Sequence, residues 1–326
     1  MTDTASLAAA LAAALPHAAG RVAPPRLSPD GVASVILDVT GLDEMARDTL
    51  ENDVRRVLLG IEGVREVRAV QTAEKYERRL IAVGSGKGGV GKSTLSANLA
   101  IALKKLGYRT GLVDADIYGP SQPRLMAAEG ERPTAESKML NPIATKWGVP
   151  MLSMGQLVAP DKALAWRGPM ASGALGQLID ARWGETDTLV VDLPPGTGDV
   201  QLSMIQKHRP AGAVIVSTPQ DLALIDAARA IDLFNTAGIP VIGIVENMAG
   251  YVCPHCGEVS DPFGNGGAEA EATRLGIPFL GRVPLDIAIR RASDAGEPPA
   301  ARDDAAAEPF LRIAEAVARG LNLTRG

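Results

Sequence analysis

One glycine-rich stretch restricts the fold of this chain more than any other feature, the run GKGGVGKST from Gly86 to Thr94. It matches the pattern G-x-x-x-x-G-K-S/T, with the apolar run LIAV before it and the helical pattern STLSANLAIALKKLG after it. A loop of this kind binds phosphate groups with its backbone N–H groups when a strand leads into it and a helix leads out. The stretch therefore predicts a nucleotide-binding α/β domain.

Short apolar runs alternate with helical patterns from about residue 76 to the C-terminus. The predicted strands are RLIAVGS, TGLVDAD, TLVVDLP, GAVIVSTP and PVIGIVENM. They are almost continuously apolar, as strands covered on both faces are. The predicted helices include ASGALGQLIDARW, DVQLSMIQKH, LALIDAARAIDLFNTAG and a last helix in AEPFLRIAEAVARGLNL. This alternation predicts a doubly wound, mainly parallel sheet of the P-loop NTPase type.

The first 75 residues predict a separate, small α+β domain. The runs ASVILDVTG and GVREVRAV alternate like strands, and LDEMARDTLENDVRRVLLGI has helical spacing. The charged run from Gln71 to Arg79 is interpreted as a linker, so the expected domains are 1–75 and 76–326. The run SLAAALAAALPHAAG predicts a first helix rather than a signal peptide, because it has Asp3 where a basic residue is expected.

Composition excludes several classes of function. The chain has 326 residues and a net charge of -5, which argues against nucleic acid as the main partner. It has no apolar run of about 18 residues, which argues against a membrane span. Its two cysteines are too few for a disulfide framework and suit a reducing cytoplasm.

The residues of the loop have separate expected roles. Lys92 is expected to reach the β- and γ-phosphates, Ser93 to place its hydroxyl on Mg²⁺, and Thr94 to contact a phosphate. The remaining nucleotide-binding residues are expected to act through their backbone N–H groups, and they are Gly86, Lys87, Gly88, Gly89, Val90 and Gly91.

A magnesium nucleotide site also needs carboxylates at the ends of neighbouring strands. Asp192 ends the run TLVVD, where a charge is costly without a cation, so it is expected to hold a metal-bound water. Asp114 and Asp116 end the run GLVDAD. We expect Asp114 to face the metal and Asp116 to position the attacking water, with helix capping and loop solvation as the alternative for the pair.

These motifs carry a family resemblance. KGGVGKST, VDADIYGPS and VVDLPPGTGD resemble the deviant P-loop ATPases, which include MinD, ParA and nitrogenase iron protein, and most closely the Mrp/ApbC group of iron–sulfur cluster carriers. The resemblance covers about residues 80–320, and the first domain resembles the MIP-type domain found in front of bacterial Mrp proteins. It implies ATP and Mg²⁺ as ligands and slow ATP hydrolysis.

The resemblance also implies roles for two further residues. Lys87, the extra lysine of the loop, is implied to reach across a homodimer to the phosphates bound by the other subunit; a solvated loop lysine is the alternative. Asn247, after the run VIGIVE, is implied to contact adenine, and a turn-forming asparagine is the alternative. The sequence lacks the N-K-x-D pattern of a guanine-binding site, which favours ATP over GTP as the nucleotide.

The two cysteines, Cys253 and Cys256, form a C-x-x-C pair in YVCPHCGE. Two thiolates supply half of a four-ligand metal site, and a two-fold axis supplies the other half. The resemblance implies a [4Fe-4S] cluster there; bridging Zn²⁺ and a redox dithiol are the alternatives. His255 between them is expected to lie on the surface of the loop.

The function expected from the resemblance is an ATP-hydrolysing homodimer in the cytoplasm that receives a cluster from a donor and transfers it to apo iron–sulfur proteins. No nucleic-acid or membrane partner is expected. The alternatives are a positioning ATPase like ParA or MinD, a zinc-bridged regulatory ATPase and a P-loop kinase. The segment 126–170, with WRGPM at Trp166–Met170, is expected to lie over the nucleotide.

Overall fold

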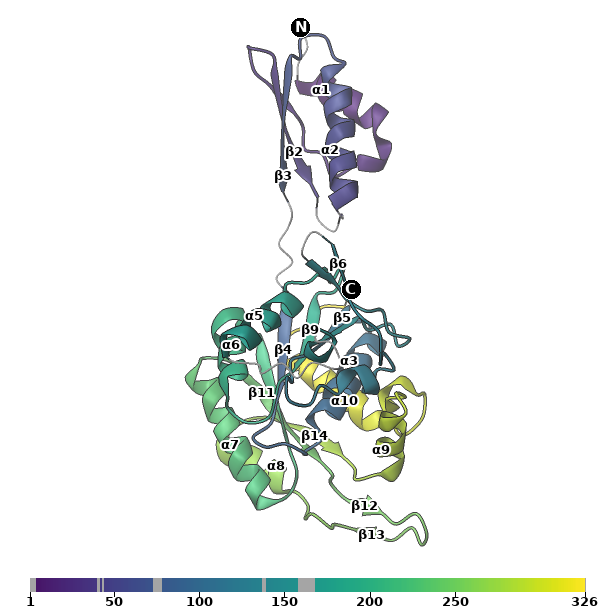
Figure 1. Ribbon diagram of the computed structural model, residues 1–326, viewed down its shortest axis with the longest axis vertical. Coiled ribbons are helices and arrows are strands. Elements are labelled where there is room, and N and C mark those ends of the chain that lie inside the picture. The colour runs from purple at the N-terminus through teal and green to yellow at the C-terminus, as the bar shows by residue number, and fades with distance from the viewer. Residues whose placement is uncertain are drawn as a thin grey trace. The chain divides into compact units, whose positions relative to one another are not determined.

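The computed structural model describes residues 4–39, 42, 44–72, 78–136, 139–157 and 168–325 (Figure 1). The chain forms two compact units, Met1–Glu77 and Arg78–Gly326. Among the described residues, every helix is too short or too polar to cross a bilayer. Trp166 of the predicted nucleotide-covering segment lies outside the described residues.

The first unit is a three-stranded sheet packed against two helices. Alternate residues of its central strand, Ala33, Val35 and Leu37, are buried in one apolar cluster with residues of both helices. The strands have the order β1-β2-β3, with β1 antiparallel and β3 parallel to β2. The elements are α1 (Thr4–Ala14), η1 (Pro16–Ala18), β1 (Arg26–Leu27), β2 (Val32–Asp38), α2 (Glu44–Leu59) and β3 (Glu66–Thr72).

The predicted linker from Gln71 to Arg79 is too long at both ends. Gln71 lies in β3, and Arg79 is the first residue of β4 (Arg79–Gly84) in the second unit. Both strand ends have polar side chains at exposed positions, so their sequence lacks the alternation of apolar and polar residues that predicts a strand.

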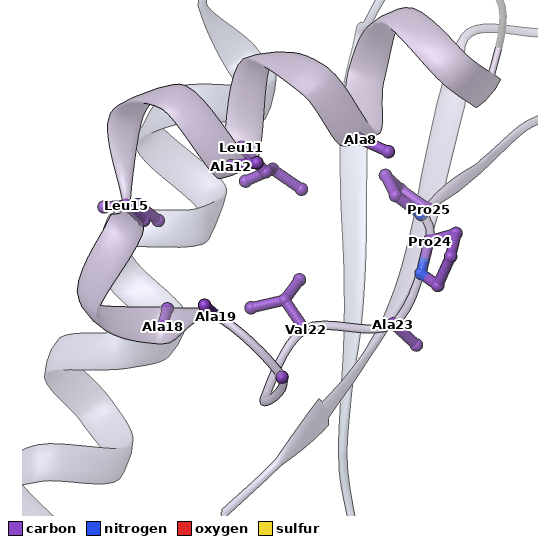
Figure 2. A pocket seen from close by; sticks show the side chains of 11 residues that line it. Ala8, Leu11, Ala12, Leu15, Ala18, Ala19, Val22, Ala23, Pro24 and Pro25 are labelled. Carbon is purple, nitrogen blue, oxygen red and sulfur yellow. The ribbon is translucent and has the colours of Figure 1, made fainter.

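A small apolar pocket lies in the first unit between α1 and the segment that follows η1 (Figure 2). Its volume is about 240 Å³, and Leu11, Leu15, Val22 and Pro24 are among its lining residues. The whole lining consists of Ala, Leu, Gly, Val and Pro, so it offers packing surface without a polar side chain to orient a ligand.

The second unit is built on a seven-stranded sheet in which every neighbouring pair is parallel. The strand order is β14-β11-β10-β4-β9-β5-β8. The five predicted strands form its centre, and the two edge strands were not predicted. The further strands are β5 (Thr110–Asp114), β8 (Met151–Ser153), β9 (Thr188–Asp192), β10 (Gly212–Ser217), β11 (Val241–Asn247) and β14 (Phe279–Val283).

Helices cover both faces of this sheet (Figure 1). Ile81 and Val83 of β4 belong to one apolar cluster, and Leu80 and Ala82 belong to the other. The prediction of a doubly wound P-loop fold is therefore confirmed. The first face carries α3 (Lys92–Lys105) and α10 (Glu308–Gly320); the second carries α5 (Gly168–Ile179), α6 (Asp199–His208), α7 (Asp221–Thr236) and α8 (Gly267–Leu275).

The parallel arrangement gathers the polar strand ends at one edge of the sheet. The phosphate loop follows β4, Asp192 ends β9 and Asp114 ends β5. Since β4 lies between β9 and β10, the chain winds away from it in both directions, which is where open α/β sheets bind ligands.

The cysteine pair lies on a hairpin that leaves the same edge of the sheet. The hairpin consists of β12 (Tyr251–Val252) and β13 (Val259–Ser260), and it follows β11 in the chain (Figure 1). Val252 and Val259 pair across it and are 60% and 68% exposed.

Candidate nucleotide and cysteine site

The phosphate loop has a backbone that glycine makes possible. Gly89 and Gly91 have φ angles of 81° and 86°, in the left-handed region that a side chain disfavours. Gly91 is the N-cap of α3, so the loop ends at the positive end of the helix dipole. Val90 is buried in the core and fixes the loop to the sheet. The loop therefore offers the N–H groups and helix terminus of an anion site.

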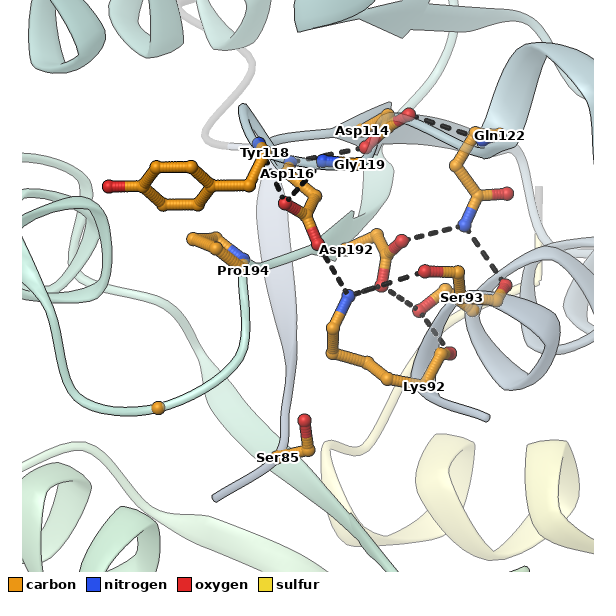
Figure 3. A network of polar contacts seen from close by, with 12 residues as sticks. Ser85, Lys92, Ser93, Asp114, Asp116, Tyr118, Gly119, Gln122, Asp192 and Pro194 are labelled. Atoms are coloured by element: carbon orange, nitrogen blue, oxygen red, sulfur yellow. Dashed lines mark hydrogen bonds and ion pairs between the residues drawn. The ribbon is translucent and has the colours of Figure 1, made fainter. Parts of the chain in front are cut away.

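Lys92 lies buried in the middle of the site, with 6% of its surface exposed (Figure 3). Its Nζ lies 2.6 Å from Oδ1 of Asp192, 3.4 Å from Oγ of Ser93 and 3.9 Å from Oδ2 of Asp116. The structure thus brings together four of the predicted site residues around one ammonium group.

Asp192 is fully buried, and each of its oxygens is hydrogen-bonded. Oδ1 accepts bonds from Lys92 Nζ and from the Ser96 hydroxyl at 2.9 Å. Oδ2 accepts one from Gln122 Nε2 at 2.9 Å. Ser96 lies one helical turn after Lys92, so its spacing could have indicated a role, whereas nothing in the sequence singles out Gln122.

Gln122 connects Asp192 to the start of α3. Its Nε2 donates to the backbone oxygen of Ser93 at 3.0 Å as well as to Asp192. Its Oε1 is buried without a hydrogen-bond partner. A buried acceptor of this kind is costly unless water or a ligand satisfies it. The Ser93 hydroxyl and the Asp192 carboxylate, both in contact with Lys92 Nζ, are oxygen donors of the kind that suits Mg²⁺.

Asp114 is fully buried behind Asp192. It accepts bonds from the Ser153 hydroxyl at 2.9 Å, from the N–H of Asp116 at 3.1 Å and from the N–H of Gln122 at 3.2 Å. Burial and the neighbouring Asp192 carboxylate raise the pKa of Asp114 to about 7, against the lowering effect of these bonds. Asp114 is thus a carboxyl group that a bound cation would deprotonate.

Asp116 faces the site with one oxygen only. Its Oδ1 accepts bonds from the N–H groups of Tyr118 and Gly119 at 3.0 and 3.2 Å, which lie in the loop after β5 and not at a helix N-terminus. Its Oδ2 is turned toward Lys92. The side chain is therefore held by its own loop and still presents an acceptor to the nucleotide site.

Asn247 lies at the end of β11 against the phosphate loop. Its Nδ2 donates to the backbone oxygen of Val90 at 2.8 Å. A Cβ atom on Gly91 would lie 2.0 Å from the same Nδ2, so this close approach requires glycine. The contact places the amide beside the nucleotide loop.

Lys87 lies half-buried in the loop, and its carbonyl oxygen accepts a bond from the Ser85 hydroxyl at 3.0 Å. The neighbouring Gly86 packs directly on α7, since a Cβ atom there would lie 2.0 Å from the carbonyl carbon of Asp226. Helix α7 therefore fixes the first half of the loop.

The cysteines lie on the hairpin and are not part of the phosphate site. Cys253 is half-buried and Cys256 is exposed. The Cys253 N–H donates to the oxygen of Glu258 at 2.9 Å, and its own oxygen accepts from Gly257 at 2.9 Å, so the turn is closed. The N–H groups of Cys256 and His255, with the Cys256 thiol, lower the pKa of Cys253. A thiolate so stabilised is a metal ligand and a nucleophile.

Comparison with known proteins shows the family of the chain. The family model described as ParA, NUBPL iron-transfer P-loop NTPase matches residues 77–318. The chain belongs to this family. It is 47% identical over 280 residues to an iron-sulfur cluster carrier protein of Deinococcus radiodurans, covering 82% of this chain and 79% of the relative. It is 45% identical over 250 residues to an Arabidopsis thaliana iron-sulfur protein required for mitochondrial NADH dehydrogenase, covering 76% and 80%.

Solved structures show the same fold. A nucleotide-binding protein in complex with ADP from Archaeoglobus fulgidus is 40% identical, with a TM-score of 0.60, over 67% of this chain and 86% of that one. MinD from Pyrococcus horikoshii, complexed with Mg-ADP, has a TM-score of 0.54 at 23% identity, over 74% and 96%. The likeness to MinD concerns the fold alone. The predicted family and the P-loop NTPase fold are both confirmed.

The packing of Gly86 on α7 predicts a difference between two alanine variants of the loop. Gly86→Ala should be destabilised by about 1–3 kcal/mol, because its methyl group meets helix backbone that cannot give way. Gly88→Ala is the matched control, because its nearest neighbour would be Pro195 at 3.9 Å. Urea unfolding followed by tryptophan fluorescence measures both, since all three tryptophans, Trp147, Trp166 and Trp183, belong to the second unit. Equal midpoints for the two variants would contradict the packing.

The raised pKa of Asp114 predicts a pH dependence of stability. In the unfolded chain the pKa of an aspartate is about 3.9, so between that pH and about 7 the native state binds one more proton. The free energy of unfolding of the metal-free protein should therefore fall as pH rises through this window, by at most about 1.4 kcal/mol per pH unit, and level off above it.

Asp114→Asn is the comparison that isolates this effect. The asparagine cannot ionise, so the stability of wild type relative to the variant should decline from about pH 5 to about pH 7. Thermal or urea unfolding without divalent cations provides the measurement. Parallel pH profiles for the two proteins would show that Asp114 does not titrate in this range.

Proposed function

We propose that this protein is an ATP-hydrolysing carrier of iron–sulfur clusters that acts as a homodimer in the cytoplasm. The observation that carries the proposal is that one strand leads to both the phosphate loop and the cysteine pair. Strand β11 ends against the phosphate loop at Asn247, and its continuation is the hairpin with Cys253 and Cys256. Relatives at 45–47% identity are named for iron-sulfur proteins, which supports the same conclusion.

The nucleotide part of the mechanism follows from the buried charges. A phosphate oxygen in the loop competes with Asp192 for Lys92, because both are anions within reach of one ammonium group. Ser93, Asp192 and Asp114 would hold Mg²⁺, which would neutralise charge on the phosphates when bound. Asp116 Oδ2, which lies 3.9 Å from Lys92 Nζ, would accept a hydrogen bond from the attacking water. Asn247 would contact the adenine base.

The second lysine of the loop completes the phosphate site in the proposed dimer. Lys87 would reach the phosphates bound by the other subunit, where a further cation stabilises the charge that develops during transfer. Hydrolysis would then require two copies of the chain. We assign the first unit as a MIP-type domain.

The cysteine part of the mechanism follows from ligand number. Each chain supplies two thiols, and a [4Fe-4S] cluster takes four, so two hairpins related by a two-fold axis would hold one cluster. The exposure of Cys256 suits a cargo that must pass from a donor to apo-proteins. Zn²⁺ would take the same four ligands and is the alternative outcome of the test.

Anaerobic reconstitution tests the cluster. Wild type treated with iron and sulfide should hold about four irons and four sulfides per dimer. The Cys253→Ala, Cys256→Ala double variant should hold none and fail to activate an apo iron–sulfur enzyme, while binding ATP like wild type. Iron that survives the double substitution, or zinc alone in wild type, would refute the carrier proposal.

Mixing two inactive variants tests the role of Lys87. Lys87→Ala and Lys92→Ala homodimers should each lose at least about tenfold in ATPase rate. A mixed dimer contains one site with both lysines only if Lys87 acts across the interface. Mixing should then restore up to about half of the wild-type rate per mixed dimer. No recovery, with mixed dimers demonstrated by differently tagged chains, would place Lys87 in its own subunit's site.

A further inference from the structure

Glu246 is a fully buried carboxylate next to Asn247 at the end of β11. Neighbouring residues of a strand point to opposite faces of the sheet. Asn247 contacts the phosphate loop at Val90. Glu246 instead contacts α8 and β14, so the two side chains connect one strand end to two different parts of the molecule.

The partners of Glu246 hold the start of α8. Its carboxylate accepts bonds from the N–H groups of Gly266 at 3.2 Å and Ala268 at 2.8 Å, and from Arg282 Nε at 3.0 Å. The N-cap of α8 is Gly266, which has no side chain to cap its own helix. The cap is therefore supplied by a charged group 20 residues earlier in the chain.

In the chain, the cysteine hairpin lies between Asn247, which contacts the phosphate loop, and the N-terminus of α8, which Glu246 caps. Residues 248–265 join Asn247 to the N-cap of α8 and contain both cysteines. The entry to this segment is held by β14 and its continuation, through bonds from Ala249 N–H to Val283 O at 3.1 Å and from Leu285 N–H to Gly250 O at 2.9 Å. The exit is held by Glu246. Both roots of the hairpin are thus fixed at the end of the strand that touches the nucleotide loop.

The entry also contains a backbone conformation of higher energy. Met248 has a φ angle of 61°, in the left-handed region that residues other than glycine seldom adopt. A residue keeps this conformation only where the surrounding contacts hold its backbone in place, and such residues are concentrated at active sites and switch regions. Here the contacts are those of Asn247 on one side and of Ala249 on the other.

We propose that Glu246 is a positioning residue that ties the cysteine hairpin to the nucleotide loop, so that a change at the loop reaches Cys253 and Cys256. The path runs from Val90 through Asn247 and Glu246 to the N-terminus of α8 and so to the exit of the hairpin. The inference rests on the proposed function in that it assigns the route by which ATP controls the thiols. It requires no particular cargo.

Alkylation of the protein free of iron and zinc tests this route. The rates at which iodoacetamide modifies Cys253 and Cys256 are measured by mass spectrometry, without nucleotide, with Mg-ADP and with a non-hydrolysable ATP analogue. In wild type, nucleotide should change the rate at one or both cysteines by about threefold or more. In Glu246→Gln the change should shrink to less than about twofold, because the neutral side chain loses its ion pair with Arg282.

Two controls separate positioning from a loss of structure. Affinity for a fluorescent ADP analogue should stay within about threefold of wild type in Glu246→Gln, since Asn247 and the loop are unchanged. Glu269→Gln removes the outer carboxylate partner of Arg282 and leaves Glu246 in place, so it should keep the wild-type nucleotide effect. If Glu246→Gln does not fold, Arg282→Lys weakens the same contact and should reduce the nucleotide effect.

Each outcome decides the proposal independently of iron. The route would be overturned if nucleotide does not change the alkylation rates of the wild-type protein. It would also be overturned if nucleotide changes the rates of Glu246→Gln as much as those of wild type. Because no iron or zinc is present, a protein that binds no cluster can still pass this test. Conversely, if the protein carries a cluster but nucleotide does not change the alkylation rates of its thiols, the proposed function stands and only the coupling through Glu246 is refuted.

Discussion

The ion pair between Lys92 and Asp192 is the interaction on which the rest of the site depends. Both groups are buried, and an unpaired charge at such depth costs several kcal/mol, so each requires the other. The pair joins the loop after β4 to the end of β9, and Ser96 and Gln122 complete its hydrogen bonds. In the proposed function, a phosphate group bound by the loop would offer Lys92 a new anionic partner, and Asp192 would then be available to Mg²⁺.

The strand order explains how one sheet serves two sites. β4 and β9 carry the phosphate site, and β11 lies two strands from β4 and reaches the loop through Asn247. The hairpin with the cysteines is a continuation of β11, and its exit returns to the same strand end through Glu246. In the proposed route, a displacement of the phosphate loop would therefore reach the hairpin through the contacts of one strand end.

Local sequence patterns predicted the central part of the fold and only some of the site. The loop, the five central strands and the position of Asp192 follow from glycine spacing and apolar runs. The three residues of β8 are too few to show a period, and they form a strand because β5 pairs with them. Gln122 and Ser153 contact aspartates 70 and 39 residues away, so no local signal marks them. The link from Glu246 to α8 was missed for the same reason, since it depends on tertiary contacts.

The central claim is that two copies of this chain hold one cluster between their hairpins, and native mass spectrometry of the anaerobically loaded protein tests it most directly. The account predicts a species with two chains and one [4Fe-4S] cluster, which dissociates to cluster-free single chains when the iron is chelated. A single chain that retains iron and sulfide would contradict it. So would a dimer whose mass does not change when the protein is loaded with iron and sulfide.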